Sequence, residues 1–151
     1  MALRMAPQSR WLELMEVVTV GLPFCGFKIV VGLTCLANGA TTAGWALVAL
    51  GVIDLVINAL NAVTLLALGR RTWAACTFSV LTPARRDLGN ALDTMFSFSL
   101  VAVMIGGGHI ASLSPPHLTA WNGCVIVNVL GAGLGRLGQS LRADSQARRV
   151  S

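Results

Sequence analysis

The chain has 151 residues, of which 55% are hydrophobic and only 11% are charged, and its mean hydropathy is +0.74. A soluble domain carries about 25% charged residues, so this composition excludes an ordinary water-soluble globule. The net charge of +5 would suit nucleic acid, but the basic residues form no continuous stripe, which excludes a nucleic-acid partner.

Four apolar stretches predict four transmembrane helices in a single domain. They cover residues 17–37, 43–69, 92–113 and 118–138. Each has about 20 residues or more, which is enough to cross a hydrocarbon core of about 30 Å. We therefore expect an all-α integral membrane protein that folds as an antiparallel bundle of four transmembrane helices. A loop at 70–91 and a basic tail at 139–151 would lie outside the bundle.

The placement of arginine predicts the orientation of these spans. Ten of the eleven basic residues lie in the N-terminal segment, the 70–91 loop and the C-terminal end: Arg4, Arg10, Arg70, Arg71, Arg85, Arg86, Arg136, Arg142, Arg148 and Arg149. The positive-inside bias then places both termini in the cytoplasm. We expect a multi-pass protein of the bacterial inner membrane, whose loop arginines meet anionic lipid headgroups, and we expect bound lipid.

Local signals indicate where the predicted helices begin. A threonine at 41–42 would cap the second span, and Ser114 would cap the fourth, with Pro115 as its first helical residue. Asn90 would cap the third span, and the negative charge of Asp93 would then be stabilised by the positive end of the helix dipole. All four tryptophans lie near predicted helix ends, which is typical of an aromatic belt: Trp11, Trp45, Trp73 and Trp121.

The loop at 70–91 is the longest predicted connection. Its segment 72–81 is moderately apolar. This segment could lie flat at the cytoplasmic interface, or it could be a connector that packs against a partner. Asp87 and Asp93 are close in sequence to the arginine pair at 85–86, so we interpret both as salt-bridged loop and cap residues.

Lys28 and Asp54 are charged residues inside predicted spans. They lie about nine and eleven residues from the outer ends of adjacent antiparallel spans, which places them at nearly the same depth. Because a lone charge at mid-bilayer costs about 2.5–3.5 kcal/mol, we expect the two to pair inside the bundle. The pair could be structural, fixing the register of the first hairpin or docking a neighbouring subunit. It could instead be a proton or ion relay, or the counter-ion of a charged ligand.

Asparagines extend this polar position along the second span. Asn58 and Asn61 follow Asp54 at spacings of four and seven, so they share its helix face. Interhelical hydrogen bonds explain such residues by default, and a hydrophilic pathway is the alternative. Asn122 and Asn128 of the fourth span could answer them across the bundle.

Glycine and histidine mark further candidate contacts. Gly131 and Gly135 have the GxxxG spacing of a helix-packing face. The triplet at 106–108 weakens the third span near its outer end and permits close approach of another group. His109 follows it and is a possible ligand-binding residue for haem or a chlorophyll-type pigment. A hydrogen-bonded interfacial histidine is the simpler interpretation.

The motifs of an enzyme or a metal centre are missing from the sequence. No GxSxG, HExxH or phosphate-binding loop occurs, and no cysteine pair has CxxC spacing. We therefore expect no catalytic residue, no metal and no resident cofactor. The leading hypothesis is a small non-catalytic subunit that packs with other integral membrane subunits in an electron-transfer, photosynthetic or transport assembly. The alternatives are a small oligomeric transporter or channel that uses the Lys28–Asp54 pair, and an intramembrane enzyme acting on lipid-soluble substrates.

Overall fold

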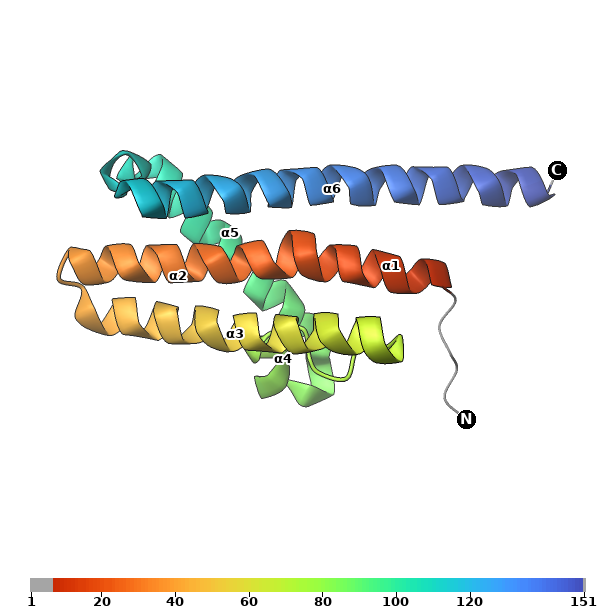
Figure 1. The fold of residues 1–151 in the computed structure, drawn as a ribbon, viewed down its shortest axis with the longest axis horizontal. Coiled ribbons are helices and arrows are strands. Elements are labelled where there is room, and N and C mark those ends of the chain that lie inside the picture. The colour runs from red at the N-terminus through yellow and green to blue at the C-terminus, as the bar shows by residue number, and fades with distance from the viewer. Residues whose placement is uncertain (1–6, 151) are drawn as a thin grey trace.

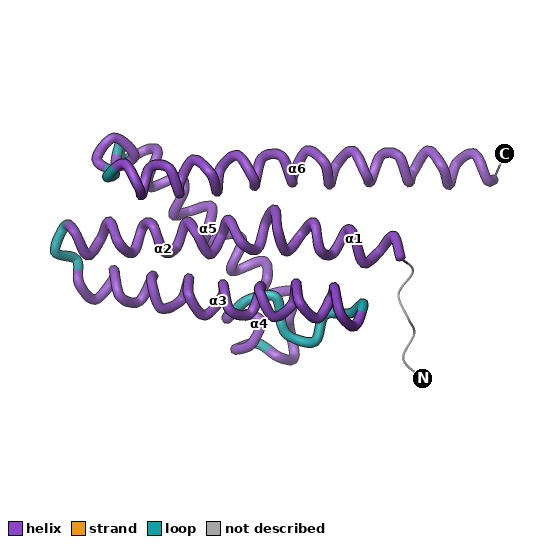
Figure 2. Tube along the Cα trace, viewed as in Figure 1, coloured by secondary structure: helices purple, strands orange, loops and turns teal. Residues whose placement is uncertain are grey.

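Long apolar runs separated by short breaks give six α-helices, which a computed structural model describes from residue 7 to residue 150. They are α1 Pro7–Glu16, α2 Leu22–Ala37, α3 Thr41–Leu68, α4 Thr77–Leu81, α5 Arg86–Gly106 and α6 Pro115–Val150. Within that range all regular structure is helical (Figure 2), and side chains are described over residues 11–134. The predictions for Arg4, Arg10, Gly135, Arg136, Arg142, Arg148 and Arg149 fall outside the described residues and side chains.

Four helical stretches are long and apolar enough to cross a membrane. They are Trp11–Ala37, Thr41–Leu68, Pro83–Gly106 and Pro115–Leu134. Their number agrees with the sequence prediction, but the third span begins at Pro83 instead of 92 and ends at Gly106 instead of 113. It begins early because Pro83 opens a 3-10 turn that leads directly into α5. It ends early because Gly108 adopts a left-handed φ of 70°, which stops the helix.

The first span is one continuous helix with an irregularity in its middle. The π-helical turn Val17–Gly21 joins α1 to α2 without a break in direction. Such turns insert an extra residue into the helix and occur frequently at functional sites. Gly21 at the end of this turn lies so close to Asn58 of α3 that a Cβ atom there would collide with the carboxamide.

The hairpin of α2 and α3 is the most extensively packed part of the fold. A short turn reverses the chain, and Gly39 has the positive φ of 80° that this turn requires. Next to this turn the backbones of α2 and α3 approach closely, since a Cβ on Gly32 would lie 2.8 Å from the carbonyl oxygen of Gly44. Small residues at such a crossing let membrane helices pack without a gap.

The other helices are arranged around α2. Figure 1 shows α3 and α6 on opposite sides of α2 with nearly parallel axes, while α5 crosses α2 obliquely. The core lies where α2, α5 and α6 meet, and it consists of Phe24, Phe27, Val30, Val31, Met104, Leu113 and Trp121. The elements thus bring mid-length positions of α2, α3 and α5 together, and this is where the polar side chains lie.

Several predictions about helix ends are wrong. Asn90 does not cap the third span, because it lies inside α5. The residue at the N-cap position of α3 is Ala40, so neither threonine at 41–42 caps this helix, and both lie inside it. Pro115 does begin α6. Trp121 belongs to the core and not to an aromatic belt, since it is 3% exposed and its ring centroid lies 4.9 Å from that of Phe27.

Candidate functional site

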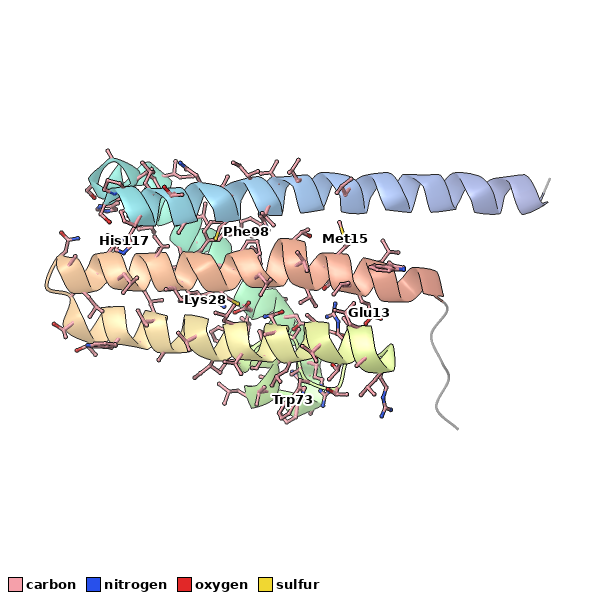
Figure 3. The ribbon with its side chains drawn as sticks, viewed as in Figure 1. Glu13, Met15, Lys28, Trp73, Phe98 and His117 are labelled. Carbon is pink, nitrogen blue, oxygen red and sulfur yellow. The ribbon has the colours of Figure 1, made fainter. Side chains whose placement is uncertain are left out.

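Lys28 and Asp54 form an ion pair in the middle of the helical hairpin. Lys28 Nζ of α2 lies 2.5 Å from Asp54 Oδ2 of α3, and the two side chains are 0% and 1% exposed. Figure 3 shows Lys28 near the middle of the hairpin, far from both of its ends. The structure therefore brings together the two residues whose depths match in the sequence.

Asp93 is a third member of this cluster. Its Oδ1 accepts a hydrogen bond from the same Lys28 ammonium. The interpretation of Asp93 as a cap residue beside the loop arginines is wrong, because α5 begins at Arg86 and Asp93 lies about two turns inside it. One ammonium therefore faces two carboxylates from two different helices. With all three groups ionised, the cluster carries a net charge of −1.

The two carboxylates are held differently. Thr77 begins α4, and both its backbone N–H and its hydroxyl donate to Asp54 Oδ1 at 2.6 Å. The first amides of a helix have no partner within the helix, so a carboxylate is a favourable acceptor for them. Asp54 thus receives three donors in total. Asp93 receives Lys28 alone among the donors of the described residues.

The asparagines of α3 bind the chain segment 73–77 that precedes and begins α4. Asn61 accepts from the N–H of Trp73 at 3.1 Å and donates to the carbonyl of Ala74 at 2.8 Å. One turn deeper, Asn58 donates to the carbonyl of Ala75 at 3.3 Å. A carboxamide offers both a donor and an acceptor, so it can replace the partners that a peptide backbone has in a sheet.

These contacts show that segment 73–77 runs back alongside α3. Asp54 and Asn61 are about 10 Å apart along a helix axis, and the four residue steps from 73 to 77 span about 13 Å when extended. Trp73 accordingly lies beside α3 instead of beyond its end (Figure 3). The segment therefore packs against α3 of the same chain, whereas the two alternatives expected for 72–81 are a flat course at the interface and a connector packed against a partner. Non-helical backbone at such depth is tolerated only where protein groups satisfy it, as the polar face of α3 does here.

Packing between α4 and α5 closes this arrangement. Ser79 Oγ donates to Asn90 Oδ1 at 2.5 Å and to the carbonyl of Arg86 at 3.0 Å. Gly89 lies against the backbone of Ser79, where a Cβ would come within 2.6 Å of it. Cys76 is 4% exposed, and burial raises the pKa of its thiol above the usual value although hydrogen bonding with Ser79 opposes the shift. This thiol is therefore protonated and unreactive at neutral pH.

A cleft of about 80 Å³ reaches this cluster from one end of the helices. It is lined by Asp54 and Asp93 of the cluster and by Glu16 and Arg71, which lie nearer the end of α3. Arg71 bridges the carboxylates of Glu13 and Glu16 at 3.4 and 3.0 Å. We call this end of the molecule the Arg71 end. Arg71 is thus held within the protein, whereas the other three loop arginines, Arg70, Arg85 and Arg86, are exposed.

The asparagines of the fourth span do not meet those of α3. Asn128 donates to the carbonyl of Thr19 in the π-helical turn at 3.1 Å, and Asn122 is exposed. Gly131 packs against the side chain of the same Thr19, where a Cβ would collide with it. Gly131 therefore lies at a contact within the chain, between α6 and the first helix.

His109 lies away from the cluster. It begins a 3-10 turn after α5 and is exposed, and its ring lies over Gly107, where a Cβ would be 2.6 Å from Nε2. Among the described residues, no group of three histidine, cysteine or acidic side chains could hold a metal ion. The Lys28–Asp54–Asp93 cluster brings three ionisable side chains together in a buried position, and such groups can exchange protons.

Comparison of the chain with protein-family models, with curated proteins and with solved structures gives no match. The interpretation of the site therefore depends on its geometry.

The sequence interpretation missed Asp93, Thr77 and the inward course of segment 73–77. Two signals could have found them. Pro83 is a helix-start signal that would place Asp93 inside a helix. The spacing of Asp54, Asn58 and Asn61 puts hydrogen-bonding side chains along one face of a helix, which is suited to binding the backbone of another segment.

Proposed function

We propose that this chain is a small, non-catalytic integral membrane subunit that packs against other integral membrane proteins. The observation that carries the proposal is the exposure of the fourth span. Only 11% of this span is buried within the chain, against 44% of the first span. α6 packs mainly on the first helix and leaves large apolar side chains exposed along its other sides, among them Ile126, Val129 and Leu130.

Lipid alone could cover these side chains, so the test must separate lipid from protein neighbours. A photo-crosslinking amino acid at Val129 of α6, which is 64% exposed, probes the proposed interface in native membranes. The same substitution at Val63 of α3, which is 60% exposed, is the matched control. We expect Val129 to give one defined protein adduct and Val63 to give lipid adducts. Lipid adducts alone from both positions would contradict the proposal.

We also propose that both termini face the cytoplasm of a bacterial inner membrane. The support is the clustering of arginines in the connection between the second and third spans, and the absence of arginine and lysine from the turns at 38–40 and 107–114. Arg85→Cys and Ser114→Cys variants would be labelled with an impermeant maleimide in intact cells. We expect label on residue 114 only, and label on both residues would overturn the topology.

A second candidate function is a small oligomeric transporter or channel for protons or ions. The observation that favours it is the cleft that leads from the Arg71 end to the buried cluster. Four transmembrane helices alone seldom enclose a polar path, so several copies would be needed. The test is ion and proton flux in liposomes that contain the purified chain. Asp93→Asn should abolish flux, and Asn122→Ala, at an exposed position of α6, should not change it.

A further inference from the structure

We propose that Asp93 is a proton-exchange site, and that protons reach it through the cleft from the Arg71 end of the molecule. The inference depends on the geometry of the cluster and stands whether the chain is a subunit or a transporter. A hydronium ion in the cleft would give its proton to the free oxygen of Asp93 and leave as water. The reverse step returns the carboxylate, and no electrons are transferred.

The hydrogen bonds distinguish Asp93 from Asp54. Both oxygens of Asp54 are occupied, one by Lys28 and the other by the two donors of Thr77. Asp93 uses one oxygen for Lys28, and its other oxygen has no donor in the described part of the chain. The Asp93 side chain is 10% exposed, against 1% for Asp54. Asp93 is therefore the carboxylate that can accept a proton without breaking an existing bond.

The net negative charge of the cluster favours the binding of this proton. Lys28 neutralises one carboxylate and leaves the second as an excess negative charge in the middle of a bilayer, where an unpaired charge is unfavourable. One proton makes the cluster neutral. The titratable groups that line the cleft beside the two aspartates are Cys25 of α2, Cys76 before α4, Glu16 and Arg71. The thiols carry no positive charge, and the charge of Arg71 is paired with the carboxylates of Glu13 and Glu16. A proton is therefore the smallest species that removes the excess charge.

The surroundings also provide a route and a partner for the proton. Asn58 and Asn90 line the cleft between the Arg71 end and Asp93. Its volume of about 80 Å³ exceeds the roughly 10–15 Å³ that one water needs, so the cleft has room for water. Ser97, one turn beyond Asp93 on α5, is fully buried and its hydroxyl has no partner in the described region. On the other side of the cluster, toward the turn between α2 and α3, most of the apolar core lies, which supports access from the Arg71 end.

A metal cation is a poorer occupant of the same position. No set of three acidic, cysteine or histidine side chains in the described residues could hold one. Asn90 Oδ1 already accepts from Ser79 at 2.5 Å, which leaves few free oxygens around Asp93. A sodium ion needs several oxygen ligands at once, whereas a proton needs a single acceptor.

The test uses a hydrophobic carbodiimide, which modifies protonated carboxyl groups, on the full chain in lipid nanodiscs with peptide mass spectrometry. We expect adducts on Asp93 and none on Asp54. The adduct yield should fall about tenfold for each pH unit above the titration midpoint. Modification of Asp54 in place of Asp93, or a yield on Asp93 independent of pH, would overturn the proposal. So would protection of Asp93 by sodium at constant ionic strength and pH, because it would show a cation site.

Infrared difference spectroscopy provides a second readout that does not depend on the reagent. A protonated carboxyl band that shifts in D₂O should be present in the wild type and in Asp93→Glu, and absent in Asp93→Asn. A band that persists in a folded Asp93→Asn protein would contradict the assignment. In sealed vesicles, the carbodiimide yield should follow the pH on the side where an impermeant maleimide labels Arg85→Cys. Dependence on the pH of the opposite side would refute access from the Arg71 end. Neither result affects the crosslinking test at Val129, so the two proposals fail separately.

Discussion

The contact between Asn61 and segment 73–77 predicts that Asn61→Ala releases this segment from α3. The substitution removes two hydrogen bonds, from the N–H of Trp73 and to the carbonyl of Ala74. At about 1 kcal/mol for each bond, the free energy needed to open this segment falls by about 2 kcal/mol. Backbone groups left unpaired away from water would lower it further. A change of about 2 kcal/mol corresponds to about a 30-fold increase in the open population.

The assay follows Cys76, which is 4% exposed and lies in this segment. The other three cysteines are replaced with alanine, and the rate of maleimide labelling is measured in lipid nanodiscs. Local opening exposes the thiol, so the rate should rise about 30-fold in Asn61→Ala. The control is Asn122→Ala, which removes an exposed asparagine from α6 and should leave the rate unchanged. An unchanged rate in Asn61→Ala would show that the asparagine does not hold the segment.

Three further predictions follow from the packing and the charges. Gly131→Leu should separate α6 from the first helix, because even a Cβ there collides with Thr19, whereas Gly133→Leu, with open space at its Cβ, should be tolerated; disulfide crosslinking between the helices would check both. Lys28→Met leaves two buried carboxylates without their cation, so the free energy of unfolding should fall by about 3–5 kcal/mol in detergent titrations. Burial raises the pKa of the Cys76 thiol in the folded state above its ordinary value of 9.0. The contribution of this thiol to the free energy of unfolding is therefore complete below pH 9.0 and is lost as the pH rises above that value. Cys76→Ala should reduce the loss of stability measured at alkaline pH.

The features that depend on a single helix, or on one hairpin of two adjacent helices, could be predicted from the sequence. Helix length against bilayer thickness gives the four spans, and depth within an antiparallel hairpin brings Lys28 and Asp54 together. Both arguments need only the rise per residue and the cost of a charge in lipid. Both arguments hold because a bilayer restricts the direction of each helix that crosses it. No such restriction applies to the helices of a soluble protein. Orientation, partners and function stay predictions, since nothing in the fold tests them.

The features that depend on helix boundaries and on a third element could not be predicted in the same way. The hydrophobic pattern places the start of the third span at 92, because the residues from 83 to 91 are polar or charged on average. In the structure these residues are helical, since their polar groups face α4 and their arginines are exposed. Asp93 consequently changes from a surface cap to a buried ligand of Lys28. An error of about two helical turns in the predicted start of this helix thus left Asp93, and its negative charge, out of the predicted cluster.

Asp54 links two functions of the cluster, and this determines which residue can be used to test it. Its one oxygen binds Lys28, and its other oxygen binds the start of α4. Any substitution of Asp54 therefore disturbs both the ion cluster and the anchorage of segment 73–77, so a loss of flux in Asp54→Asn would not separate chemistry from folding. Asp93 has a single bond to Lys28, and Asp93→Asn preserves its shape while removing the excess charge. A change of activity in Asp93→Asn with Cys76 still protected would therefore report on the proton, and not on the position of the loop.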